Sequence, residues 1–179
     1  VALGFISGFT GEALDRAVRE RGIKTDFIRL KEGNTRINVK LKGKVETEIN
    51  ARGPKITDND ILKLYEKLDR ISDGDTLVLA GSVPNGLPKD IYEKILSRLS
   101  GKGIRFAVDA TGELLTNVLK YHPFLIKPNR SELEEIVSRE LSSDKEIASA
   151  ATELKQKGAV NVLVSLGGDG ALLVDEFGK

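Results

Sequence analysis

The chain has 179 residues, of which 40% are hydrophobic and 31% are charged, enough apolar content for one sizeable core. Its 28 basic and 27 acidic residues give a net charge of +1, which provides no electrostatic reason to expect nucleic acid or a membrane as a partner. Cysteine is absent and His122 is the single histidine, so disulfides and thiolate metal sites are excluded, and a histidine-built site or triad is hard to assemble. The sequence shows no apolar run of about 20 residues and no signal peptide, which leads us to expect a cytoplasmic protein.

The first part of the chain predicts a strand, a helix and then a hairpin. Residues 1–6 form an apolar strand, and an apolar stripe between residues 10 and 21 predicts a helix that ends at Gly22. Apolar and polar residues then alternate strictly over 36–41 and 45–50, with Gly43 between the two segments. This pattern predicts an antiparallel hairpin with one apolar and one polar face. We expect residues 25–50 to form a small β lid, and residues 1–24 and 51–179 to form the core.

After Gly53 and Pro54, helical patterns alternate with short apolar runs. Thr57 caps the first of these helices, and a later capping box begins at Ser143. Strand-length apolar runs cover residues 76–80, 104–108, 124–126, 160–165 and 171–174. Apolar strands that alternate with amphipathic helices are typical of an α/β fold, with a mainly parallel sheet and helices on both faces.

Four segments of small or phosphate-compatible residues come directly after these strands. They are residues 81–86, 109–112, 127–132 and 165–170. Because ligands of such sheets bind outside the carboxyl ends of the strands, the four segments predict a nucleotide or sugar-phosphate site. The sequence contains neither a Walker lysine loop nor a Gly-x-Gly-x-x-Gly after a strand, which disfavours a dinucleotide-binding oxidoreductase. The segment 165–170 joins two strands and is equally consistent with a tight hairpin turn.

The third segment carries the most informative chemistry. Lys127 is followed by Asn129 and Glu132, which lie three residues apart and therefore share one face of a helix start. A lysine beside an amide and a carboxylate can hold a phosphate and, through water, a magnesium ion. The same two residues also form an ordinary capping box. The residues alone leave both interpretations open.

Several motifs occur in one order and with a spacing that resembles a known family. The chain resembles the PfkB (ribokinase-like) carbohydrate kinases, and within them the branch of 1-phosphofructokinases and tagatose-6-phosphate kinases. The matching segments are Gly8–Gly11, Thr35–Lys40, Thr47–Asn50, Leu79–Pro84, Leu125–Asn129 with Glu132, and Val164–Ala171.

The resemblance implies ATP-dependent, magnesium-assisted transfer of a phosphoryl group to a hydroxyl of a ketose phosphate. Fructose 1-phosphate, converted to fructose 1,6-bisphosphate, is the expected substrate, with a tagatose-6-phosphate kinase as the alternative. By similarity, Lys127 approaches the phosphates of ATP. Asn129 and Glu132 match the family's Asn-x-x-Glu element, which organises magnesium through water. The nucleotide-lining residues implied by the match are Ser165, Gly167 and Gly170.

The resemblance also assigns the sugar-phosphate side of the site. The hairpin resembles the family's lid, with Arg36 gripping the phosphate that the sugar already carries and Asn38 or Lys40 nearby. A forked guanidinium suits bidentate phosphate recognition. Asn50 and Ser82 are placed in the same substrate site. In the family a partner's lid often covers the apolar face, so we expect a homodimer through the β lid.

Two family motifs do not occur in the chain. The Gly-Ala-Gly-Asp motif with the catalytic aspartate is absent, and so is the upstream Gly-Gly-Lys-Gly sugar-binding segment. Asp169 does not replace the catalytic aspartate, because its loop matches an earlier turn of the family. We therefore assign no catalytic residue and expect an incomplete chain that resembles a middle portion of the family. A nucleotide- or sugar-phosphate-binding module without catalysis is the alternative.

Overall fold

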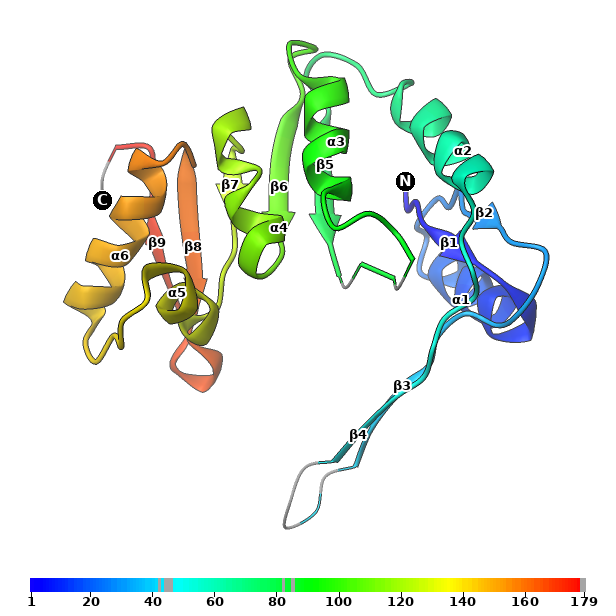
Figure 1. Cartoon of the computed structure of the whole chain (residues 1–179), viewed down its shortest axis with the longest axis horizontal. Coiled ribbons are helices and arrows are strands. Elements are labelled where there is room, and N and C mark those ends of the chain that lie inside the picture. Colours follow the sequence, from blue (N-terminus) through cyan, green and yellow to red (C-terminus); the bar gives the residue numbers. More distant parts are fainter. Residues whose placement is uncertain (42, 44–46, 82, 85, 178–179) are drawn as a thin grey trace. The chain divides into compact units, whose positions relative to one another are not determined.

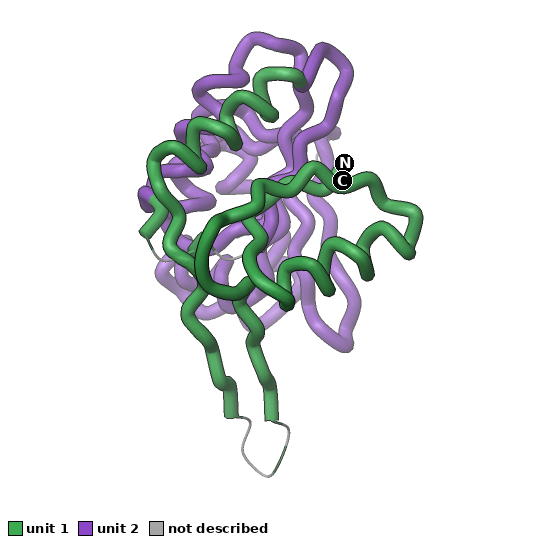
Figure 2. Tube along the Cα trace, turned by 90° about the vertical axis from the view of Figure 1, so that its right-hand side faces the viewer, with its two compact units in different colours: residues 1–70, 83–87 green, residues 71–82, 88–179 purple. Residues whose placement is uncertain are grey.

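The computed structural model describes residues 1–41, 43, 47–81, 83–84 and 86–177. The chain forms two compact units, shown in different colours in Figure 2. Unit 1 consists of Val1–Arg70 and Val83–Leu87, and unit 2 of Ile71–Ser82 and Pro88–Lys179. Among the described residues, no helix has the length and apolar character needed to cross a membrane.

Unit 1 is built on a short parallel strand pair. β1 (Phe5–Ile6) pairs with β2 (Ile28–Arg29), and α1 (Gly8–Glu20) connects the two strands. The strand predicted over residues 1–6 is continued toward the N-terminus by one isolated bridge from Ala2 to Thr25. α2 (Asp58–Leu68) follows later in the chain and begins at a complete capping box, as predicted for Thr57. Ile6 and Ile28 of the paired strands are buried and supply part of the core of this unit.

The predicted hairpin is present in unit 1. β3 (Asn38–Leu41) and β4 (Thr47–Asn50) are antiparallel, with Asn38 opposite Asn50 and Val39 opposite Ile49. The segment 25–50 therefore contains this hairpin and also β2, which pairs with β1. The division of the chain into a core and a lid remains a prediction.

Unit 2 contains the main sheet of the chain. Its strands follow the order β5-β6-β7-β8-β9, in which the first four are parallel and the last is antiparallel to its neighbour (Figure 1). The strands are β5 (Thr76–Ala80), β6 (Arg105–Asp109), β7 (Leu125–Ile126), β8 (Asn161–Ser165) and β9 (Ala171–Val174). The connecting helices are α3 (Ile91–Leu99), α4 (Gly112–Thr116), α5 (Arg130–Val137) and α6 (Asp144–Gln156). Short 3₁₀ turns lie at η1 (Leu119–Tyr121) and η2 (Gly167–Asp169). The α/β class and the mainly parallel sheet are thus confirmed.

The connecting helices of unit 2 gather on one face of its sheet. Strand order runs in one direction from β5 to β8, and right-handed crossovers in one direction place every connecting helix on the same side. Figure 1 shows α3 to α6 on that side. On the other face, Val78 and Leu173 remain 62% and 50% exposed. The connecting helices of unit 2 therefore cover one face of its sheet, and helix cover of the second face remains a prediction.

Alternate residues of the strands face the helices and form the core of unit 2. Val108, Ile126, Val162 and Val164 are each at most 1% exposed. The helices contribute further fully or nearly fully buried side chains, including Leu96, Leu99, Leu133, Ile147 and Leu154. Leu133 is 0% exposed and fixes α5 in this core, one turn from the helix start that carries the candidate site. Removing a buried leucine side chain typically costs about 2–5 kcal/mol.

Candidate active site

The carboxyl ends of the parallel strands in unit 2 bring the predicted nucleotide residues together. The backbone N–H of Lys127 donates to the carbonyl of Val108, which continues the pairing of β7 with β6. Asn129 and Ser165 form a parallel bridge just beyond β7 and β8, and the N–H of Ser165 donates to the carbonyl of Pro128 at 3.0 Å. Asn129 and Ser165, which are 36 positions apart in sequence, thus become neighbours at one edge of the sheet.

The start of α5 is a complete capping box. The N–H of Glu132 donates to Oδ1 of Asn129 at 2.9 Å, and the N–H of Asn129 donates to Oε2 of Glu132 at 2.8 Å. Two of the backbone N–H groups that this helix end leaves without intrahelical partners are therefore satisfied within the protein. Because a carboxylate has about four acceptor positions, this bond leaves Glu132 capable of further contacts. The capping interpretation is confirmed, and it is compatible with a role in ligand binding.

Lys127 forms an ion pair across the strand ends. Its Nζ lies 3.2 Å from Oδ2 of Asp109, the last residue of β6. The two side chains are 40% and 42% exposed, so the pair is open to solvent. Asp109 also raises the pKa of the buried Tyr92, although desolvation is the larger cause of that shift. The hydroxyl of Tyr92 donates to the carbonyl of Gly81 at 3.2 Å, which ties the loop after β5 to this group.

The carboxyl ends of the parallel strands in unit 2, with the segments that follow them, form what we call the strand-end rim. The turn between β8 and β9 presents backbone groups at this rim. Gly167 and Gly170 have φ values of 64° and 94°, a region that favours glycine because a Cβ is strained there. The N–H of Leu166 donates to the carbonyl of Gly170 at 2.8 Å and closes the turn. The hairpin-turn interpretation of this segment is confirmed. A turn without bulky side chains would allow a flat ligand to approach its backbone closely.

Four of the five predicted sugar-phosphate residues, Arg36, Asn38, Lys40 and Asn50, lie in unit 1, along the hairpin. Nε of Arg36 donates to Oδ1 of Asn38 at 2.6 Å. Glu48 lies between Lys40 and Asn50: its Oε1 is 2.5 Å from Nζ of Lys40, and its Oε2 accepts from Asn50 at 3.3 Å. The hydrogen bond from Lys40, and then that from Asn50, lowers the pKa of Glu48. These contacts place the polar side chains on one face of the hairpin.

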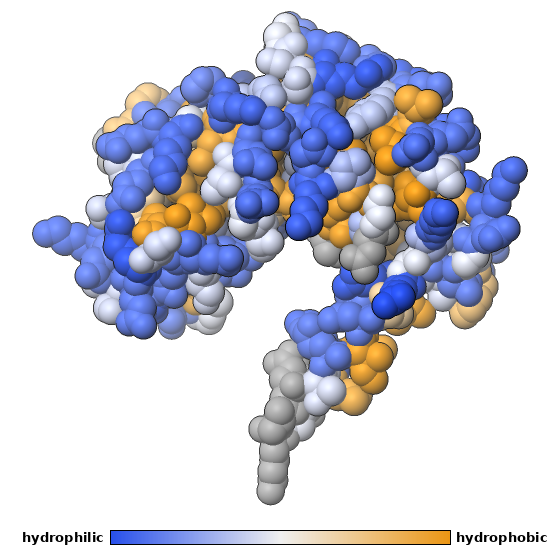
Figure 3. Space-filling model, in the orientation of Figure 1, coloured by the Kyte–Doolittle hydropathy of each residue, from blue (hydrophilic) through white to orange (hydrophobic). Residues whose placement is uncertain are grey.

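The opposite face of the hairpin is apolar and exposed. Val39, Leu41 and Ile49 are 42%, 52% and 55% exposed. Figure 3 shows apolar surface along one side of this arm. An isolated two-stranded hairpin is marginally stable in water, so this face requires cover for lasting order.

Sequence reasoning did not assign Asp109 or Tyr92 to the site. The segment 109–112 was recognised as part of the strand-end rim, but the ion pair with Lys127 depends on the β6–β7 register, which the sequence does not reveal. Ser82, expected at the substrate site, lies outside the described residues.

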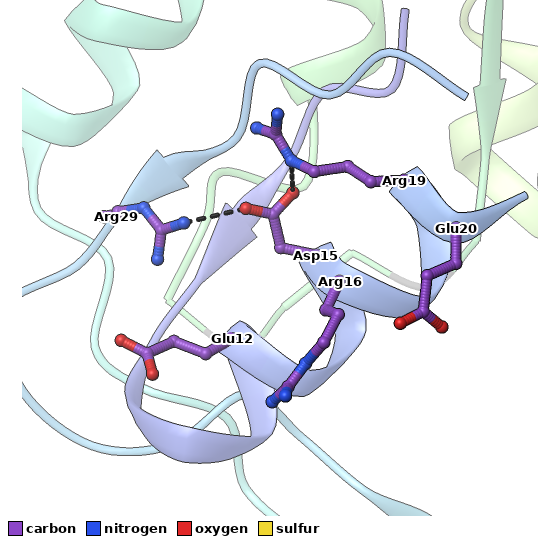
Figure 4. Close-up of a pocket in the computed structure, with 6 residues that line it drawn as sticks. All are labelled: Glu12, Asp15, Arg16, Arg19, Glu20 and Arg29. Atoms are coloured by element: carbon purple, nitrogen blue, oxygen red, sulfur yellow. Dashed lines mark hydrogen bonds and ion pairs between the residues drawn. The ribbon is translucent and has the colours of Figure 1, made fainter. Parts of the chain in front are cut away.

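A second cluster of charges, in unit 1, lines a hollow of about 540 Å³ (Figure 4). Asp15 is 6% exposed and accepts from the hydroxyl of Thr25, from Nε of Arg19 and from Nη2 of Arg29. These contacts, first among them the Thr25 hydroxyl, lower the pKa of Asp15. The cluster joins α1 to the β2 edge, and its charges are largely compensated within the protein, so we regard it as structural.

The comparisons with known proteins identify the family of the chain. A family model described as "pfkB family carbohydrate kinase" matches residues 1–179. The chain therefore belongs to the PfkB carbohydrate kinases.

Among similar proteins is a 1-phosphofructokinase of Bacillus subtilis, 45% identical over 172 residues, covering 96% of this chain and 56% of the relative. A D-tagatose-1-phosphate kinase of Bacillus licheniformis is 37% identical, covering 97% of this chain and 57% of the relative. The sugar in that name differs from the tagatose 6-phosphate of the expected alternative. The chain spans just over half the length of these relatives.

Solved structures show the same fold. Phosphofructokinase-2 of Escherichia coli in complex with fructose-6-phosphate has a TM-score of 0.85 at 30% identity, covering 97% of this chain and 59% of that one. A tetrameric inhibited form of the same enzyme has a TM-score of 0.85 at 31% identity, covering 97% and 59%.

Proposed function

We propose that this chain forms the ATP-phosphate site and the sugar-phosphate hairpin of a kinase that converts fructose 1-phosphate to fructose 1,6-bisphosphate. The observation that carries the proposal is the strand-end rim of unit 2, where Lys127, Asn129 and Ser165 meet in a chain of the PfkB family. The names of the most similar relatives support a ketose phosphate as the acceptor.

In the proposed reaction, the γ-phosphorus of ATP forms a bond to the acceptor hydroxyl oxygen and loses its bond to the β,γ-bridging oxygen, which leaves with ADP. The acceptor hydroxyl gives up its proton to a base. The sequence contains no Gly-Ala-Gly-Asp, and we assign the base to none of its residues. Lys127 contributes a positive charge where the transferred phosphoryl group carries negative charge, which is the main requirement of phosphoryl transfer.

We propose that magnesium binds near the oxygen atoms of the Asn129 and Glu132 side chains at the start of α5. Among the described residues, no group of three or more histidine, cysteine, aspartate or glutamate side chains could hold a metal alone. This fits Mg²⁺, which keeps several waters and binds through one or two carboxylates together with substrate phosphates. Glu132, and Asn129 through water, would hold the ion. When bound, it would neutralise charge on the phosphates.

Arg36 is proposed to bind the phosphate that the sugar already carries. Of its five N–H donors, Nε–H is engaged by Asn38, and a bidentate phosphate contact needs only two of the other four. Asn38, Lys40, Asn50 and Ser82 are proposed as its neighbours in the substrate site, while Gly167 and Gly170 would line the nucleotide. A lid that closes over the site would exclude water and so protect ATP from hydrolysis.

The apolar face of the hairpin is proposed to dimerise with the same face of a second copy. Its exposed residues, Val39, Leu41 and Ile49, would be covered in a symmetric contact of two hairpins. We propose a cytoplasmic location, because ATP and sugar phosphates are available there.

The proposal is tested by measuring ADP release from the complete gene product with MgATP and each of fructose 1-phosphate, fructose 6-phosphate and tagatose 1-phosphate. Turnover with fructose 1-phosphate at the highest kcat/KM is expected. The variant Arg36→Ala should raise the KM for the sugar phosphate at least 10-fold and change that for ATP less than twofold. Binding of ATP and sugar phosphate without ADP release would favour the non-catalytic alternative, which the missing aspartate motif supports.

A further inference from the structure

The base of the hairpin is fastened to the start of α1 by a cluster of hydrogen bonds in unit 1. Ser7 is 4% exposed, and its hydroxyl, with one hydrogen to donate, lies 2.7 Å from the carbonyl oxygen of Glu32 and 3.0 Å from that of Gly33. These contacts hold the segment that leads from β2 to the hairpin against the residue that precedes α1. The segment is therefore anchored before β3 begins.

Thr35 is held on every polar atom that it offers. Its backbone N–H donates to the carbonyl of Ser7 at 2.8 Å, and its carbonyl accepts from the hydroxyl of Thr10 at 2.9 Å. Its own hydroxyl accepts from the backbone N–H of Ser7 at 2.8 Å. The peptide groups on both sides of Thr35 are thus fixed, and the second of these is the one that carries Arg36.

Two glycines allow this close approach. A Cβ on Gly11 would lie 2.7 Å from Oγ1 of Thr35 and 3.0 Å from Cβ of Ile6, so a larger residue cannot occupy this buried position without displacing the contact. Gly8, with a φ of 59°, faces Asn34, and a Cβ there would lie 2.1 Å from Oδ1 of that residue. Glycine at both positions is required for α1 to meet the hairpin base.

Arg36 is therefore oriented from two directions. On the backbone side it follows the fixed Thr35, and on the side-chain side its Nε is engaged by Asn38 in β3. Arg36 itself is exposed, and its stem lies beside Gly53, where the chain leaves the hairpin. An arginine side chain loses conformational entropy when it binds a phosphate. Because the backbone before Arg36 and its Nε are already held, less entropy remains to be lost on binding.

We infer that Thr35 is a positioning residue. Together with Ser7 and Thr10, it fixes the point from which the guanidinium of Arg36 reaches the phosphate of a sugar phosphate. This inference rests on the proposed function, since it assigns Thr35 to the sugar-phosphate side of that site. The same contacts make Thr35 the place where the hairpin joins the rest of unit 1, so residues beyond it depend on it for their orientation.

The test compares Thr35→Val, which removes the hydroxyl at nearly constant volume, with Thr35→Ser, which keeps it. Thr47→Val in β4 supplies the same change at an exposed position of the hairpin. Three quantities are measured on the complete gene product. They are the amide hydrogen exchange of residues 35–41 and 47–50, the Kd of fructose 1-phosphate and the Kd of MgATP, the last two by calorimetry. Exchange reports the order of the hairpin base without any need for catalysis.

We expect Thr35→Val to speed exchange at Arg36 and in β3 at least 10-fold and to raise the Kd of fructose 1-phosphate at least 10-fold, with the Kd of MgATP changed less than twofold. Thr35→Ser and Thr47→Val should stay within threefold of the parent in all three quantities. Unchanged exchange in Thr35→Val would overturn the inference, as would faster exchange with unaltered sugar-phosphate binding. If the parent binds MgATP but no sugar phosphate of any kind, the proposed function itself is refuted, and the positioning role with it.

Discussion

Lys127 and Asp109 lie at the ends of neighbouring strands, and Nζ of the lysine is 3.2 Å from Oδ2 of the aspartate. Both side chains are about two-fifths exposed, so the pair contributes only about 0–1 kcal/mol to stability. A phosphate that binds Lys127 must compete with this carboxylate for the ammonium group. We therefore expect the pair to affect ligand binding more than folding.

From this competition we expect Asp109→Asn to bind metal-free ATP about 3- to 10-fold more tightly, because a repulsive charge and an internal competitor are removed together. The free energy of unfolding should change by less than about 1 kcal/mol. Calorimetric titration with ATP in the presence of a chelator measures the effect. Weaker binding by the variant would show that Asp109 supports the ligand and does not compete with it.

The capping box at Asn129 allows stability and binding to be separated. Asn129→Ala should lower the free energy of unfolding by about 1 kcal/mol because the cap is lost. It should also weaken MgATP binding, since we propose that the same amide helps to hold the ligand. Asn129→Asp keeps a capping oxygen but adds a negative charge, so it should retain stability and still lose affinity. Thr57→Ala removes the cap of α2 in unit 1 and is the matched control. The affinity of Thr57→Ala for MgATP should equal that of the parent. If Asn129→Ala and Asn129→Asp also bound MgATP as tightly as the parent, Asn129 would serve only as a helix cap.

The acid stability of unit 1 should depend on Asp15. The contacts from Thr25 first, and then from Arg19 and Arg29, hold its pKa below the ordinary value of 3.8. A carboxyl whose pKa is lower in the folded than in the unfolded protein stabilises the fold. This contribution is complete at pH values above the unfolded pKa, and it is lost as the pH falls through the folded pKa. Asp15→Asn should therefore have a lower Tm than the parent at pH 7, and the difference should shrink below about pH 3.8.

Thermal unfolding at a series of pH values measures this difference. Glu66→Gln, an exposed carboxylate on α2, is the control and should change the Tm little at any pH. A constant difference between Asp15→Asn and the parent from pH 7 to pH 2.5 would contradict the assignment.

The proposed dimer is tested by placing a charge on the apolar face of the hairpin. Ile49→Lys should weaken self-association at least 10-fold, since an unpaired charge in an apolar contact is costly. Leu62 on α2 is 57% exposed, close to the 55% of Ile49, and Leu62→Lys is the matched control. Sedimentation velocity over a range of concentrations distinguishes the two. A parent that is monomeric at high concentration, or an Ile49→Lys variant that remains dimeric, would refute a dimer through this face.

The sequence predicted the elements better than their relations in space. Alternation over 36–41 and 45–50 was sufficient for the hairpin, and the residue types at Asn129 and Glu132 were sufficient for the cap, because both features are local. Which face of the sheet the helices cover depends on strand order, which apolar runs such as 76–80 do not encode.

Two contacts that the sequence did not reveal join residues far apart in the chain. Thr35 and Ser7 are 28 residues apart, and Asp109 and Lys127 are joined only through the register of two strands. Gly11 gave a signal, as a glycine within a predicted helix, where its lack of a side chain needs a reason. That reason, the approach of Thr35, is visible only once the chain is folded.

The most direct measurement of the central claim is the affinity of MgATP for the parent and for Lys127→Met, by calorimetry on the complete gene product. Lys157→Met is the matched control. It removes an equal charge at the exposed C-cap of α6, away from the candidate site residues in the sequence. A loss of at least 10-fold in affinity for Lys127→Met, with Lys157→Met within twofold of the parent, is the predicted result. Equal affinity of all three proteins would contradict a phosphate site at the strand ends of unit 2.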